Sequence, residues 1–464
     1  MRCNSNWCRA FIVAGFVLLL PACGGNGGLG SGAPLPLNLA PPARVQLPPA
    51  GRVHRSSSSG KIQHIVIVVQ ENRSFNNLFY GFPGATTATY GYDTHGNKIT
   101  LQPIGLETTW DLEHDSNGFF TACNGTGSIP GTNCQMNGFD GEYWGCHSCP
   151  NQNPPYSYVP NSETTPYFDM GKQYVLADQM YASNLDASSF ISHQYIIAAQ
   201  AEGSVNFPWG AWGCDGGSGD MIGIIGPNRS VPDGYQQACY SDTSLGQEAD
   251  NAGVSWGFYT STINGDGGIW SAYQANQYVY YGNDWKNDII TPQTTFFSDV
   301  ADGRLRQISW ITPTCANSDH AGCGSKTGPS WVASIVNAIG ESQYWKSTAI
   351  FIFWDDYGGW YDPEPPAYED YDGLGMRIPM LIVSAYAKKG HVSHIHYEHG
   401  SILKFVEDTF GLPRLAASDT RANSPASDAF NFKKPARDFK KIPTDYSKWY
   451  FLHQPPDLRP PDTN

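Results

Sequence analysis

The first 60 residues contain no aspartate or glutamate, although the whole chain has 42 acidic residues. Of the 28 lysines and arginines, 23 follow this stretch, so the rest of the chain carries a net charge of −19. A body so short of basic residues excludes nucleic acid as a partner, because phosphate backbones are bound by clustered lysine and arginine. Internal repeats are also lacking, which favours one elaborate domain over an array of small units.

The apolar run near the N-terminus, residues 11–20, is too short to cross a bilayer. Arg2 and Arg9 precede it and supply positive charge. The letters LPAC, ending at Cys23, resemble a bacterial lipobox. We therefore expect residues 1–22 to be a lipoprotein signal peptide. Lipidated Cys23 would then anchor the exported protein to a membrane, in the outer membrane facing the periplasm or at the cell surface. An ordinary signal peptide cleaved nearby is the alternative.

Eight cysteines follow the predicted anchor, and an even number in an exported chain suggests disulfides. Proximity in the sequence suggests four pairs: Cys123–Cys134, Cys146–Cys149, Cys214–Cys239 and Cys315–Cys323. Cys146 and Cys149 form a CxxC motif that could instead begin a zinc or redox site, but no second CxxC matches it.

Two apolar runs stop abruptly at polar residues. Residues 65–69 read IVIVV, which is typical of a buried parallel strand, and Glu71 and Asn72 follow. Residues 349–353 read AIFIF and are followed by Asp355 and Asp356. In open α/β sheets, ligands bind at the carboxyl ends of the strands.

These four polar residues predict a metal site. Adjacent carboxylates such as Asp355 and Asp356 repel each other unless a cation or a shared proton compensates. With Glu71 and Asn72 they form an all-oxygen set of the type that hard divalent cations prefer. For Glu71 and Asn72 alone, an ordinary strand end before a capped helix is the alternative.

Ser189 is the candidate nucleophile. Residues 184–189 are turn-like, and residues 190–201 are predicted to form an amphipathic helix. Ser189 would lie at the helix N-terminus, where free N–H groups and the helix dipole stabilise an alkoxide and a phosphoryl oxygen. The alternative is that Ser188 or Ser189 only caps the helix.

His114 and His320 each lie in polar, loop-like sequence beside an acidic residue that could orient the ring. A histidine in such a place can donate to a phosphate oxygen or protonate a leaving alkoxide, and a surface histidine is the alternative. Among the four histidines of residues 391–399, we expect His399 to neighbour the site and the other three rings to be exposed.

Several segments carry a family resemblance when taken in order: QENRSFNNLFYG, DLEH, SSFISHQYIIAAQ, AGVSWGFY, ISWITPT, WDDYGGWYD and RIPMLIVSAYAKKG. Together they resemble the bacterial phosphoesterase family that contains acid phosphatases and non-haemolytic phospholipases C, related to the alkaline phosphatase superfamily. The similarity covers residues 61–415, and the ENRSF and DDYGG motifs are specific in combination.

The resemblance implies an α/β fold with an alkaline-phosphatase-like core, in which helices flank a mainly parallel sheet and the insertions are loop-rich and disulfide-bonded. It also implies roles for particular positions: a metal at Glu71, Asn72, Asp355 and Asp356, phosphorylation at Ser189, and His114 and His320 near the phosphate. The ion could be calcium, magnesium, manganese or zinc.

The expected organisation is a Gly-, Pro- and Ser-rich flexible linker at residues 23–60 and a single phosphoesterase catalytic domain at residues 61–464. SHQYIIAAQA is more similar to the acid phosphatases of the family, which favours phosphate monoesters as substrates. A phospholipase C acting on lipid head-group diesters is the alternative. A third hypothesis is a non-catalytic surface lipoprotein that binds a partner through its 14 tryptophans and 26 tyrosines.

Overall fold

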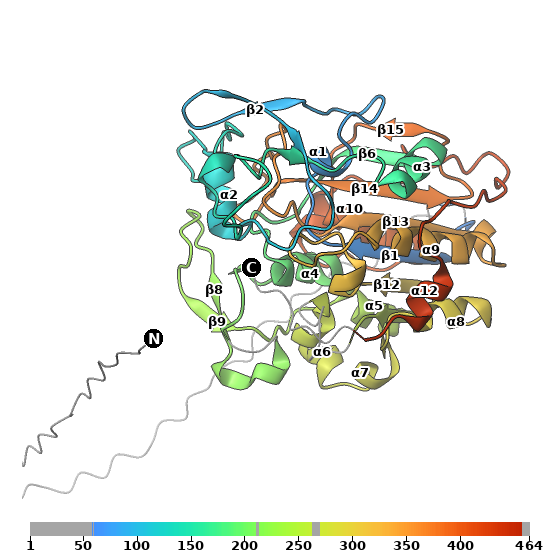
Figure 1. The fold of residues 1–464 in the computed structure, drawn as a ribbon. Coiled ribbons are helices and arrows are strands. Elements are labelled where there is room, and N and C mark those ends of the chain that lie inside the picture. Colours follow the sequence, from blue (N-terminus) through green and yellow to red (C-terminus); the bar gives the residue numbers. More distant parts are fainter. Residues whose placement is uncertain (1–57, 59, 210–212, 262–269, 457–464) are drawn as a thin grey trace, which may run out of the picture. The chain divides into compact units, whose positions relative to one another are not determined.

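The two apolar runs form neighbouring strands of one sheet in a computed structural model that describes residues 58, 60–209, 213–261 and 270–456 (Figure 1). β1 (His64–Gln70) pairs in parallel with β13 (Thr348–Trp354), and Gln70 lies opposite Trp354. Because the strands end at the same level, the polar residues that follow them emerge side by side. The predicted signal peptide and Cys23 lie outside the described residues.

The central sheet has nine strands, in the order β11-β10-β12-β1-β13-β14-β6-β15, with β16 also paired to β6. β14 is antiparallel to both of its neighbours, and the other described pairs of this sheet are parallel. This confirms the prediction of a mainly parallel sheet. The remaining strands are β6 (Val175–Tyr181), β10 (Trp256–Tyr259), β11 (Ile289–Ile290), β12 (Ile308–Ile311), β14 (Arg377–Ser384), β15 (His391–Ser393) and β16 (Tyr397–Glu398).

Helices flank this sheet in two groups that the contacts between elements distinguish (Figure 1). In the first group, α3 (Thr165–Gln173), α8 (Thr295–Ala301) and α12 (Lys448–His453) all contact α9 (Gly328–Gly340). In the second, α5 (Leu245–Ala252) and α10 (His399–Phe410) both contact α4 (Ser189–Ala198), and α11 (Ala417–Arg421) contacts α10. The candidate nucleophile lies in this second group.

Shorter elements make up the loop-rich parts between the strands. Three small sheets pair β2 (Tyr90–Tyr92) with β3 (Lys98–Thr100), β4 (Gln102–Pro103) with β5 (Ser157–Tyr158), and β8 (Met221–Ile224) with β7 (Ser204–Val205) and β9 (Tyr235–Gln237). The short helices are α1 (Phe75–Leu78), α2 (Ser116–Cys123), α6 (Gln277–Tyr280) and α7 (Asp284–Asn287). Among the described residues, no helix is long and apolar enough to span a membrane.

The central strands are apolar because they are buried in the hydrophobic core. Residues 65–69 of β1 are completely buried, as a strand with parallel neighbours on both sides requires. The C-terminal tail covers part of this core, since Phe451 of α12 packs edge-to-face on Trp331 of α9 with ring centroids 5.3 Å apart.

All four predicted disulfides are present: Cys123–Cys134, Cys146–Cys149, Cys214–Cys239 and Cys315–Cys323. The alternative of a zinc site at Cys146 and Cys149 is therefore wrong for this structure, since the two sulfurs are bonded to each other. The alternative of a redox site stays a hypothesis, because a redox CxxC motif also forms this bond. Each bridge closes a short loop, with sequence separations from 3 to 25 residues.

Candidate active site

The turn after β1 is built around the backbone of Asn72. This residue has φ 54°, in the left-handed region that asparagine tolerates better than most residues, and its N–H donates to Asp355 Oδ1 at 3.1 Å. The turn after β13 passes very close by, since a Cβ atom added to Gly358 would lie 2.2 Å from the Asn72 carbonyl oxygen. Gly358 therefore allows the two turns to meet.

We expect Gly358→Ala to lower the free energy of unfolding by about 1–3 kcal/mol, because its φ is 59° and its new methyl group overlaps the Asn72 carbonyl. Thermal denaturation measures the effect. Gly219→Ala is the control, because a Cβ there meets no heavy atom within 4 Å, and it should change stability by less than about 0.5 kcal/mol. Equal stability of the two variants would show that the turns can separate without cost.

Three carboxyl groups lie together, completely buried, at the ends of these strands: Glu71, Asp355 and Asp356. Burial, and then the neighbouring Asp355, raise the pKa of Glu71 and of Asp356 well above their ordinary values. Burial alone would also raise the pKa of Asp355, but it lies below its ordinary value because of His193 and hydrogen bonds that include the Asn72 N–H. Burial therefore disfavours the ionised forms of Glu71 and Asp356, and a bound cation would offset this effect.

Ser189 is the first residue of α4, at the helix N-terminus that the sequence predicts. The preceding Ser188 occupies the N-cap position, but its side chain does not cap the helix, because its hydroxyl donates instead to Asp186 Oδ1 at 2.7 Å. Ser189 Oγ lies 3.3 Å from the Asn72 side-chain amide, and it also hydrogen-bonds Glu71. The candidate nucleophile and two of the predicted metal ligands are therefore in direct contact.

The Asn72 amide joins the nucleophile to both candidate histidines. With its oxygen turned toward the rings, it accepts from His114 Nε2 at 2.9 Å and from His320 Nε2 at 3.1 Å, and its nitrogen donates to Glu71 Oε2 at 3.1 Å. Both rings are buried, so the alternative of surface histidines is wrong. The structure thus brings together all seven residues predicted for the site.

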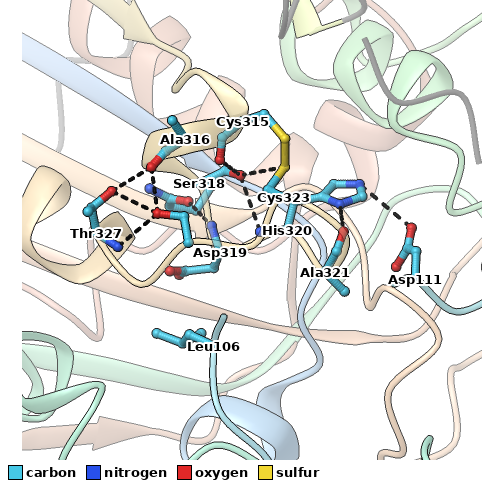
Figure 2. The surroundings of a disulfide bond; sticks show 12 residues. Leu106, Asp111, Cys315, Ala316, Ser318, Asp319, His320, Ala321, Cys323 and Thr327 are labelled. Carbon is cyan, nitrogen blue, oxygen red and sulfur yellow. Dashed lines mark hydrogen bonds and ion pairs between the residues drawn. A yellow bond between two sulfur atoms is a disulfide. The ribbon is translucent and has the colours of Figure 1, made fainter. Parts of the chain in front are cut away.

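The orientation of the two rings differs from the prediction. His114 Nδ1 donates to the Leu112 carbonyl at 2.6 Å. His320 Nδ1 donates to the Ala321 carbonyl (Figure 2), so backbone groups and not the adjacent acids orient both rings. Asp319, beside His320, instead accepts from Tyr167 at 2.7 Å. Since Nδ1 of each ring is engaged, Nε2 of each ring is the atom that faces the site.

The Cys315–Cys323 disulfide closes the loop that carries His320 (Figure 2). The same loop is attached to the end of β1, because the Asp319 N–H donates to Gln70 Oε1 at 3.0 Å and Gln70 Nε2 donates to the Asn317 carbonyl at 3.2 Å. The disulfide and the side chain of Gln70 thus fix the place of His320 relative to the carboxylates.

Two residues of the site were missed by the sequence reasoning. His193 Nε2 lies 3.0 Å from Glu71 Oε1 and 3.7 Å from Asp355 Oδ2, and burial lowers its pKa to about 4. Asp111 Oδ2 lies 3.9 Å from His114 Nδ1 and 4.0 Å from His320 Nε2. A signal for His193 was present, because residues four apart share one face of a helix and His193 follows Ser189 by four.

Three of the four histidines in residues 391–399 lie as predicted. His399 is buried near Asp355, and burial lowers its pKa to about 4. His394 and His396 are exposed. The prediction was wrong for His391, whose partly buried ring pairs with Asp428 at 2.9 Å.

A cavity of about 330 Å³ lies beside His114. Three acidic residues and two aromatic residues contribute to its lining: Asp111, Glu113, Asp115, Tyr143 and Phe207. The cavity therefore offers negative charge and apolar surface next to a histidine of the site.

The residues present fit a divalent metal ion. Asp355 Oδ2 is buried and has no hydrogen-bond partner among the described residues, which is costly unless a cation balances it. It lies in a group with Glu71 and His193 whose three ligand atoms are all within 4.8 Å of one another. Two carboxylates and an imidazole within this distance are a set that can surround one ion.

A family model described as "Phosphoesterase family" matches residues 62–413 of the chain. This range contains all seven residues predicted for the site. It confirms the resemblance recognised in the sequence motifs, and with it the expectation of a phosphoester hydrolase at the level of the family.

Curated relatives include phospholipases C. The chain is 23% identical over 480 residues to a non-hemolytic phospholipase C of Burkholderia pseudomallei, covering 85% of this chain and 62% of that protein. It is 24% identical over 450 residues to phospholipase C B of Mycobacterium tuberculosis, covering 82% and 79%. Similarity to non-specific phospholipase C1 of Arabidopsis thaliana is 23% over 392 residues, covering 76% and 68%.

Similar solved structures include a protein of the alkaline phosphatase superfamily from Vibrio parahaemolyticus, with a TM-score of 0.38 and 10% identity over 80% of this chain and 72% of that one. A sulfatase from Pseudoalteromonas sp. gives a TM-score of 0.39 and 9% identity, covering 82% and 74%.

Proposed function

Because the chain belongs to the Phosphoesterase family, we propose that it is a metal-dependent hydrolase that cleaves phosphate diesters through a phosphoserine at Ser189. The contact of Ser189 with Glu71 and Asn72, at the start of a buried helix, is the observation that carries this proposal. A nucleophile in this place is adjacent both to the carboxylates and to the two histidines.

In the first step, Ser189 gives its proton to the ionised Glu71 that it contacts, its oxygen attacks phosphorus in line with the leaving group, and the bond from phosphorus to the leaving alcohol breaks. The N–H groups of the first turn of α4 face the phosphoryl oxygens and stabilise their charge. A metal held by Glu71, Asp355 and Asp356 would supply positive charge to the serine and phosphate oxygens, and Asn72 would join these ligands only with its amide oxygen turned from the rings toward the carboxylates. The Asn72 amide contacts Ser189 and both imidazoles and so holds them in fixed positions relative to one another.

The histidines handle the proton of the leaving alcohol. Nε2 of His114 and of His320 faces the Asn72 amide, which itself contacts Ser189, so a protonated ring in this place can give its proton to the departing oxygen. Water then attacks the phosphorus bound to Ser189, and the same ring, now neutral, accepts a proton from that water. Glu71 returns its proton to the departing Ser189 oxygen. The cycle ends with free Ser189 and a phosphate monoester of the group that remained on phosphorus.

The cavity beside His114 and the phospholipase C relatives support diesters over the monoesters that the sequence favoured. A diester carries a second substituent that needs space next to the phosphate, and a monoester does not. The acidic and aromatic lining suits a positively charged group, since aromatic faces and carboxylates both attract quaternary ammonium.

The test compares p-nitrophenylphosphorylcholine with p-nitrophenyl phosphate, with divalent metals added in turn. We expect the choline diester to give the higher kcat/KM, and Glu113→Gln to lower that preference about fivefold, because a partly exposed charge pair contributes about 1 kcal/mol. Asp140→Asn, outside the cavity lining, is the control and should leave the preference unchanged. Turnover confined to the monoester would instead assign an acid phosphatase.

The predicted anchor at Cys23 extends this proposal. A lipid attached there would hold the enzyme at a membrane, where phospholipid head groups are its nearest substrates. A Cys23→Ser variant should leave the membrane fraction for the soluble fraction of exported protein.

A further inference from the structure

His193 lies on the same helix as the nucleophile, one turn further along. α4 begins at Ser189, so residues 189 and 193 stand on one face of the helix, and both contact Glu71. His193 is completely buried. The helix thus presents a hydroxyl and an imidazole together to the same carboxylate.

The distances around His193 Nε2 suit a shared ion. The atom lies 3.0 Å from Glu71 Oε1 and 3.7 Å from Asp355 Oδ2, from two different strand ends. Ligand atoms on one ion with bonds of about 2.0–2.2 Å lie about 2.8–3.6 Å apart in octahedral or tetrahedral geometry, so the first distance falls within this range and the second is slightly longer. Asp355 Oδ2, the carboxylate oxygen on this side, has no hydrogen-bond partner among the described residues.

We propose that His193 is a ligand of the catalytic metal, and that the centre therefore selects a divalent transition-metal ion such as Zn²⁺ over Ca²⁺ or Mg²⁺. An all-oxygen set suits the hard ions, whereas an imidazole nitrogen favours the borderline ones. The inference rests on the proposed metal-dependent phosphoesterase and specifies its metal. Carrying the ligand on α4 also ties the position of the ion to that of Ser189.

The experiment measures metal binding and not turnover. Equilibrium dialysis of the whole exported chain against Zn²⁺ and then Mg²⁺ is repeated with His193→Gln, which keeps a hydrogen-bond donor but removes the imidazole. We expect the Zn²⁺ affinity to fall more than 100-fold, beyond the 10–100-fold that loss of a residue behind the ligands usually costs, and the Mg²⁺ affinity to change less than tenfold. Ser192→Ala, in the same turn of α4, is the control and should change neither affinity.

A measurement on the unaltered chain covers the case in which the variant does not fold. Pulsed EPR of the Mn²⁺-loaded protein should show a nitrogen coupling from a directly bound imidazole. Equal loss of Zn²⁺ and Mg²⁺ affinity in His193→Gln, or no nitrogen coupling, would reduce His193 to a hydrogen-bond partner of Glu71 and overturn the proposal. Failure of the unaltered chain to bind any divalent ion would overturn the metal-dependent function itself, which is a separate result.

Discussion

Ser189→Ala should lower kcat for phosphate ester hydrolysis by about 10⁴- to 10⁶-fold, the loss typical of removing an enzyme's nucleophile. The reason is that Ser189 Oγ alone at the start of α4 contacts both Glu71 and the Asn72 amide among the described residues. Steady-state kinetics with p-nitrophenylphosphorylcholine measures the loss. Acid quenching of the unaltered enzyme during turnover of this diester, followed by mass spectrometry, should also show phosphorylcholine on Ser189.

Ser188→Ala is the matched control for this experiment. Ser188 is one residue earlier and equally buried, but its hydroxyl donates to Asp186 and not toward the carboxylates. Its loss removes one buried hydrogen bond, which costs about 1 kcal/mol of stability and leaves the nucleophile in place. An inactive Ser188→Ala variant together with an active Ser189→Ala variant would show that Ser188, and not Ser189, is the nucleophile.

Glu71→Gln should lower the activity of the metal-loaded protein and raise the stability of the metal-free protein. Activity should fall more than 100-fold, because an amide cannot supply the negative charge that holds the ion. Without metal, however, the variant should be the more stable protein above about pH 4.5, because burial and Asp355 raise the pKa of Glu71 and an uncharged amide avoids ionisation.

The direction in which stability changes with pH follows from the raised pKa of Glu71. A carboxyl group whose pKa is raised by folding stabilises the folded protein only while it is protonated, so stability is lost as the pH rises above the unfolded value of 4.5. Each pH unit from there to the raised pKa should cost the unaltered protein about 1.4 kcal/mol relative to Glu71→Gln. Thermal unfolding between pH 5 and pH 8, with a chelator present, measures this difference.

Added metal should reverse the order of the two proteins at pH 8, since an ion that binds only the folded state stabilises it by mass action. Glu341→Gln, on the surface beside Lys441, is the control and should show neither effect. A difference between Glu71→Gln and the unaltered protein that did not change with pH would mean that Glu71 is ionised in the metal-free protein.

Local patterns were sufficient for much of the site. The residues that end the two strands were predictable, because a β-branched run that stops at polar residues marks the carboxyl end of a buried strand. The parallel register of β1 and β13 then placed Glu71 beside Asp355. The disulfides were also predictable, since each joins cysteines that are close in the sequence.

Long-range contacts account for what the sequence reasoning missed. Asp111 was overlooked because Glu113 and Asp115 are nearer to His114 along the chain, whereas the folded loop brings Asp111 to both rings. Our proposed substrate changed from monoesters to diesters for the same reason, because the cavity beside His114 is formed by segments around residues 111, 143 and 207.

The sequence by itself determined the class of fold, the family, the four disulfides and which residue types could hold a metal and attack phosphorus. These follow from hydrophobic periodicity, motif order and short separations along the chain. Only the tertiary structure decided that Asn72 bridges the nucleophile and both histidines, and that His193 faces Glu71 and Asp355. Those contacts join residues far apart in the chain, and their distances depend on how the strand ends and α4 pack together.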